Sequence, residues 1–131
     1  MPRHLVALVA AFYMLSACET VSAAPRWEKG MKVPVAAACK TKDAILAVVV
    51  GDKESDGESN LAFINQARLG QCVSFGKVIG LAIIGEIVER YKDHSGEAVA
   101  VVRAISPNAP GANFFLLLYE KIAYRINYRE A

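Results

Sequence analysis

Residues 77–91 read KVIGLAIIGEIVERY, and this stretch decides the fold class of the second half of the chain. Branched apolar residues are frequent in it, and such residues are enriched in strands. Glycines stand at positions 80 and 85. A glycine inside a strand often marks a bulge or a bend. The stretch therefore predicts one long, bent strand.

The residues that follow predict an antiparallel sheet. The polar segment KDHSG, residues 92–96, has the composition of a turn, and EAVAVVRAI, residues 97–105, is again rich in branched residues. Residues 86–105 therefore predict a hairpin. The segment SPNAPGAN, residues 106–113, predicts a loop, and FFLLLYE, residues 114–120, is apolar on both faces, as is typical of a central strand.

Two short helices are predicted upstream of this sheet. In residues 40–54, KTKDAILAVVVGDKE, Thr41 is a candidate N-cap, although the three consecutive valines favour a strand. We predict a helix there. The polar residues 52–60 predict a turn, and residues 59–70 predict a second helix, with Gly70 suited to the position after its end.

The predicted fold class is therefore α+β, with two short helices followed by a small antiparallel β-meander. The second half of the chain also resembles bacterial SH3-like small barrels, through a strand after a cysteine, a bent hairpin and a terminal apolar strand. The resemblance implies a curled sheet, and it implies no ligand site. The tail, residues 121–130, alternates apolar and polar residues, and either an edge strand or a last helix fits it.

The first residues have the pattern of an export signal. Arg3 is followed by an uncharged apolar run of eleven residues, 5–15. A helix of that length spans roughly 16 Å, whereas a bilayer core is about 30 Å thick. The run is therefore too short for a stable membrane anchor, and it fits the apolar region of a secretory signal.

The signal is followed by LSAC, residues 15–18, an aliphatic residue, two small residues and a cysteine. This motif resembles the lipobox of bacterial lipoprotein precursors. The resemblance implies that residues 1–17 are a signal peptide and that Cys18 carries the lipid. Residues 18–38, which show no sustained period, would then be a tether, and residues 39–131 a single globular domain.

The same resemblance implies a location in the bacterial cell envelope, anchored to a membrane and facing the periplasm. Glu19 stands where an Asp would signal inner-membrane retention in that class, so the outer membrane is favoured. Small residues at 21–23 offer a second cleavage site. Cleavage there would remove Cys18 and leave a soluble secreted or periplasmic protein.

Cys39 and Cys72 remain once Cys18 is assigned. Export places them in an oxidising compartment, so we predict a disulfide between them. Two free thiols and a redox pair are the alternatives. A redox pair usually shows a Cys-x-x-Cys motif, which the sequence lacks.

Charge and motifs narrow the function classes. With 15 basic and 13 acidic residues, the chain has a formal net charge of only +2, so nucleic acid is not a predicted partner. Asp52, Asp56 and Gly57 fit positions of a calcium loop, but Phe63 occupies the position of its bidentate acid. His94 is the only histidine after Cys18, and a lone histidine cannot supply a zinc site. We predict no catalytic residue, no metal and no cofactor.

The leading prediction is a non-catalytic binding module that contacts an envelope protein or a wall component. A first alternative is an inhibitor of a wall-degrading hydrolase that acts through residues 106–113. A second is a carrier of a small apolar ligand, for which residues 78–84 supply apolar surface. The predicted partner-contact residues are Tyr119, Tyr124, Arg125 and Tyr128.

Overall fold

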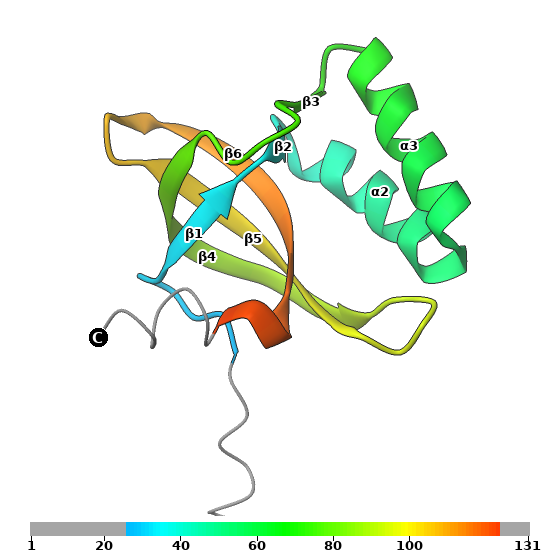
Figure 1. The fold of residues 1–131 in the computed structure, drawn as a ribbon. Coiled ribbons are helices and arrows are strands. Elements are labelled where there is room, and N and C mark those ends of the chain that lie inside the picture. Colours follow the sequence, from blue (N-terminus) through cyan, green and yellow to red (C-terminus); the bar gives the residue numbers. More distant parts are fainter. Residues whose placement is uncertain (1–25, 124–131) are drawn as a thin grey trace, which may run out of the picture.

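The structure is a computed structural model, and it describes residues 26–123. This part of the chain forms six strands, two α-helices and a closing 3-10 turn (Figure 1). In chain order the elements are β1 (Lys32–Val35), β2 (Ala37–Cys39), α2 (Lys42–Glu54), α3 (Asp56–Arg68), β3 (Cys72–Ser74), β4 (Gly80–Lys92), β5 (Ala98–Ser106), β6 (Ala109–Tyr119) and η1 (Glu120–Ile122).

The six strands form one curled antiparallel sheet in the order β1-β4-β5-β6-β2-β3. Only Ala36 separates β1 from β2 in the chain, yet three strands lie between them in the sheet. One residue can join these strands only if the sheet bends back on itself. Figure 1 shows the resulting half-barrel.

The predicted α+β class is confirmed, but the predicted order of its elements is wrong. β1 and β2 precede the helices. β1 lies within the predicted tether, residues 18–38, and β2 begins in it and ends at Cys39. The second half of the predicted tether therefore belongs to the sheet. These strands have only four and three residues, and their partners β4 and β6 lie far away in the sequence. No local sequence pattern therefore predicted these two strands.

The β4–β5 hairpin is confirmed, and so is the bend in its first strand. The register shifts between Ile84 and Glu86, on either side of Gly85, and again between Ile87 and Glu89. The central place of β6, between β5 and β2, is also confirmed.

The loop predicted at residues 106–113 is wrong, because β6 already begins at Ala109 and this residue pairs with Ser106. Proline, glycine and asparagine disfavour strands. Pairing with the long strand β5 overrides that local preference.

Both faces of the central strands are covered. On β5, Ala100 and Val102 face the inside of the curl, where the larger core lies, whereas Val101 faces the helices. The inner core contains Trp27, Val33, Val35, Ala82, Ile84, Ala100, Val102, Ala104, Leu116, Leu118 and Ala123. The outer core contains Cys39, Ala44, Ile45, Val49, Cys72 and Val101.

Helix α2 covers the outer face of the sheet, and α3 packs beside it. The Thr41 side chain accepts a hydrogen bond from the Ala44 N–H, which confirms the predicted cap. The turn predicted at residues 52–60 is wrong, because Ser55 ends α2 and caps α3 with no loop between them. A side chain at Gly51 would lie 2.5 Å from the Glu58 carbonyl oxygen, so glycine permits the two helices to approach closely.

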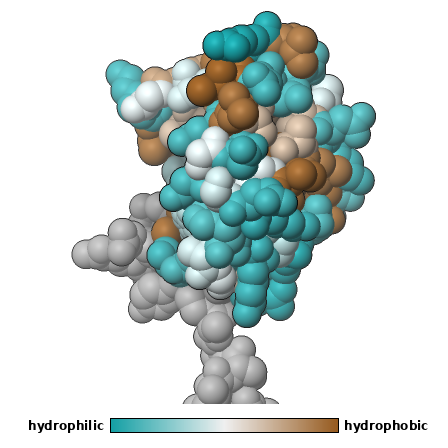
Figure 2. All heavy atoms as spheres, turned by 90° about the vertical axis from the view of Figure 1, so that its right-hand side faces the viewer, coloured by the Kyte–Doolittle hydropathy of each residue, from teal (hydrophilic) through white to brown (hydrophobic). Residues whose placement is uncertain are grey.

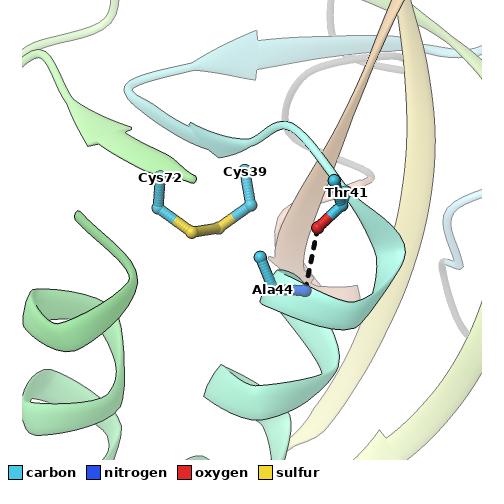
Figure 3. Close-up of a disulfide and its surroundings, with 4 residues drawn as sticks. All are labelled: Cys39, Thr41, Ala44 and Cys72. Carbon is cyan, nitrogen blue, oxygen red and sulfur yellow. Dashed lines mark hydrogen bonds between the residues drawn. A yellow bond between two sulfur atoms is a disulfide. The ribbon is translucent and has the colours of Figure 1, made fainter. Parts of the chain in front are cut away.

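The predicted disulfide between Cys39 and Cys72 is confirmed (Figure 3). The two cysteines are direct cross-strand partners in β2 and β3. Helices α2 and α3 are thus an insertion into a β-hairpin, and the disulfide closes the hairpin at their base. A disulfide is consistent with an extracytoplasmic location.

The predictions on the export signal, on Cys18 and on most of the tail lie outside the described residues. Within residues 26–123, no helix is both long enough and apolar enough to cross a membrane.

Candidate functional site

One end of the curled sheet holds an apolar pocket of about 370 Å³. This size lies in the lower part of the range typical of small-molecule sites, roughly 300–1,000 Å³. The strands meet here where β1 passes into β2 and where β4 and β6 begin. The residues that line the apolar pocket are Val35, Ala38, Cys39, Lys40, Val73, Phe75, Ile79, Gly80, Leu81, Ala82, Ser106, Asn108 and Phe114.

The mouth of the apolar pocket is formed by the segment between β3 and β4. Phe75 donates its N–H to the Ala36 carbonyl, and Ile79 donates its N–H to the Val35 carbonyl. Gly76, with φ of 74°, adopts the left-handed conformation that lets the chain turn between these two anchor points. The side chains of Phe75 and Ile79 stay exposed. Buried Val35 and Ala82 lie deeper in the lining.

Three residues add polar atoms to the lining. Lys40, which follows β2 directly, is exposed and carries the only formal charge among the lining residues. Ser106 and Asn108, at the β5–β6 turn, are the two neutral polar residues of the lining. The lining therefore consists mainly of apolar residues, together with one cationic and two neutral polar residues.

At the opposite end of the sheet, which we call the Trp27 end, a tryptophan side chain is buried in the inner core. The Trp27 side chain is fully buried, and its Nε1–H donates to the Tyr119 carbonyl at 2.8 Å. The Trp27 backbone N–H donates to Glu120 Oε1 at 3.1 Å, and its carbonyl accepts from Arg90 Nη2 at 2.7 Å. The polar atoms of this residue are therefore paired inside the protein, as burial requires.

An ion pair completes the Trp27 end. Arg90 Nη1 lies 2.6 Å from Glu120 Oε2, and only 9% of the Glu120 side chain is exposed. Arg26 adds a longer contact of 3.5 Å to the same oxygen. Because Glu120 also accepts from the Trp27 backbone, the network joins the start of the described chain to β4 and to the end of β6.

A third polar cluster joins the β4–β5 turn to the corner between the helices. The Tyr91 hydroxyl donates to Asp52 Oδ2 at 2.6 Å. Burial, together with this bond to a carboxylate, raises the pKa of Tyr91. The Asp93 carboxylate accepts from the Ser95 hydroxyl, which lowers the pKa of Asp93, and further bonds come from the backbone N–H groups of the turn.

His94 lies in the same cluster. It contacts the Asp52 carbonyl through Nδ1 at 3.1 Å and Asp56 through Nε2 at 3.3 Å. The Asp52 carbonyl and then the nearby carboxylates raise the pKa of His94. Ligand atoms of Asp52, Asp93 and His94 lie within 4.8 Å of one another, a spacing that could hold a metal ion. Hydrogen bonds within the protein already use both carboxylates, so the cluster is explained as a structural contact.

The structure describes only one of the four predicted partner-contact residues. Tyr119 ends β6 with an exposed ring, and Lys121 Nζ lies 5.5 Å from the ring centroid. It lies at the Trp27 end, away from the apolar pocket. Tyr124, Arg125 and Tyr128 lie outside the described residues.

Sequence reasoning found part of the apolar pocket and missed the rest. The apolar run predicted at residues 78–84 supplies part of its lining. Lys40, Val73, Phe75 and Phe114 were not singled out. Val73 and Phe75 follow the disulfide-bonded Cys72 and are two residues apart. In an extended chain their side chains therefore point to the same face. This two-residue spacing was the sequence signal that could have indicated a shared apolar surface. Only the curled sheet brings these residues to the start of β4.

The helical side presents a different kind of surface. Figure 2 shows a mainly hydrophilic face on which the hydrophobic areas occur in separate groups. The exposed apolar residues of the helices and the turn after them are Val50, Leu61, Ile64 and Leu69. Scattered apolar residues of this kind are normal on protein surfaces.

No protein-family model, no curated protein and no solved structure was found to match this chain.

Proposed function

We propose that this protein is a lipid-anchored, non-catalytic binding protein of the bacterial cell envelope, and that the apolar pocket is its binding site. The observation that carries the proposal is the apolar pocket itself. It combines a size suited to a small ligand, a mostly apolar lining and a few polar residues. This combination favours the carrier of a small apolar ligand over a module that recognises a polar surface.

Exposure of the lining supports the same proposal. Val73, Phe75, Ile79 and Leu81 are all exposed around the apolar pocket, whereas most apolar side chains of the central strand β5 are buried. Exposed apolar surface gains free energy when a ligand covers it, by about 25 cal/mol for each Å² removed from water. The four side chains thus supply a driving force for binding that the folded chain leaves unused.

The envelope location is the second part of the proposal. It rests on the lipobox-like residues 15–18 and is supported by the disulfide, since disulfides persist in oxidising compartments. The likeness to SH3-like small barrels also stays a proposal, which the curled sheet supports. Inhibition of a wall-degrading hydrolase keeps less support, because the loop that would carry it is a tight turn between β5 and β6.

Binding of a neutral solvatochromic dye, Nile red, to the purified full chain tests the proposed site. The matched variants are Leu81→Gln, in the lining, and Leu61→Gln, on α3. The two leucines are 47% and 50% exposed, so both variants are expected to fold. We expect Leu81→Gln to weaken dye binding about tenfold, the effect of roughly 1.4 kcal/mol, and Leu61→Gln to leave it unchanged. Equal binding by all three proteins would refute the site.

A further inference from the structure

We propose that the natural occupant of the apolar pocket is an amphiphile with one alkyl chain and an anionic head, held with the head at Lys40. This inference rests on the proposed function, because it assigns a ligand class to the same site. The proposed function requires only an apolar group. The inference adds that the head of the ligand is recognised, and that its charge is negative.

The lining divides into two parts that match the two parts of such a molecule. Most of the lining residues, Val35 and Phe114 among them, have apolar side chains, which suit an alkyl chain. The polar groups are those of Lys40, Ser106 and Asn108. A wholly apolar ligand offers no acceptor to these groups, whereas the oxygen atoms of a head group can accept a hydrogen bond from an ammonium, a hydroxyl or an amide N–H.

The charge of the head follows from the lining residues. Lys40 is cationic, and the lining contains no aspartate or glutamate. A cationic head would meet only repulsion from Lys40, and a neutral head would gain no ion pair. An anionic head gains a charge-assisted hydrogen bond, which is shorter and stronger than a neutral one. Because Lys40 is exposed, the gain is that of a surface ion pair, up to about 1 kcal/mol.

The test uses three competitors that share one alkyl chain and differ in head: decanoate, decanol and decylamine. Each displaces Nile red from the full chain carrying Cys18→Ser, so that no acyl group at that residue can compete. We expect decanoate to bind about three- to fivefold more tightly than decanol, since 1 kcal/mol corresponds to about fivefold in affinity. Decylamine should bind more weakly than decanol.

Two charge-reversal variants identify the recognising residue. Lys40→Glu should abolish or invert the preference for decanoate while it leaves decanol binding unchanged. Lys42→Glu is the matched control, because it makes the same charge change two residues away at an exposed position outside the lining. It should retain most of the preference for decanoate.

The outcomes separate this inference from the proposed function. Equal affinity for decanoate and decanol, or a preference for decylamine, would overturn the inference and leave the apolar pocket standing as a binding site. Loss of the preference in both lysine variants would also overturn it, because a diffuse field rather than Lys40 would then be responsible. If no competitor displaced the dye, and Leu81→Gln bound the dye as well as the parent chain, the proposed function itself would fail.

Discussion

The two ends of the curled sheet are built in opposite ways, although the same strands form both. β4 and β6 begin beside the apolar pocket and end beside Trp27. At the Trp27 end, one large side chain fills the curl, and hydrogen bonds satisfy its polar atoms. At the other end lies the apolar pocket, and the segment between β3 and β4 leaves apolar side chains exposed.

The Trp27 end stabilises the fold, whereas the end with the apolar pocket has side chains available for binding. Trp27 is buried and bonded, so any change there is expected to alter the fold. Phe75 and Ile79, at the mouth of the apolar pocket, are held through their backbones, and their side chains are exposed. Their side chains can therefore change with little effect on the fold, which makes this end suited to binding.

The largest expected effect comes from Trp27→Ala. Truncation of a buried tryptophan typically costs about 3–5 kcal/mol, because it removes transfer free energy and leaves a cavity. Urea denaturation would measure the loss in the free energy of unfolding. The matched change at the other end, Ile79→Ala, removes an exposed side chain and should cost about 0.5 kcal/mol or less. Similar losses in the two variants would contradict the contrast between the ends.

The next effect tests how the apolar pocket is held together. Replacing Cys39 and Cys72 with alanine removes a crosslink between residues 33 apart in the chain. A loop of that length predicts a loss of about 3–4 kcal/mol, because the unfolded chain becomes less constrained. The variant should also lose Nile red binding, since both β2 and β3 contribute to the lining. Full dye binding without the disulfide would show that the site does not depend on it.

A smaller effect is expected when Glu120 becomes alanine. This change leaves Arg90 Nη1 and the Trp27 N–H without their acceptor, which costs about 2–3 kcal/mol for a group of low exposure. Glu28 is the control. It also contacts Arg90, at 3.5 Å, but 58% of its side chain is exposed. Glu28→Ala should cost about 0.5 kcal/mol or less, and equal costs in denaturation would contradict the assigned role of Glu120.

The smallest effect concerns His94, where the hairpin turn meets the helices. Its pKa is raised in the folded protein, chiefly by the Asp52 carbonyl. Its contribution to stability is therefore complete below the unfolded value of about 6.5 and is lost as the pH rises through the folded pKa. In His94→Gln, the free energy of unfolding should fall less as the pH rises, because the imidazole no longer contributes to the decrease. Urea midpoints across this pH range would measure it, and unchanged pH dependence would refute it.

Local chemistry explains which parts of the fold could be predicted from the sequence. The cap at Thr41, the bend around Gly85 and the β4–β5 turn depend on neighbouring residues, so they could be predicted. β1 depends on the distant strand β4 and the start of β6 depends on pairing with β5, whereas the prolines of both segments argued against strands. The turn predicted before α3 failed because Ser55, a single residue, both ends one helix and caps the next.

The sequence by itself determined the α+β class, the long hairpin and the pairing of Cys39 with Cys72, because composition, turn residues and the number of remaining cysteines are local or countable properties. Only the tertiary structure decided that Trp27 is buried at one end of the curled sheet and that Lys40 lines an apolar pocket at the other. These features arise from contacts between residues far apart in the chain, and no pattern along the sequence records which distant segments meet.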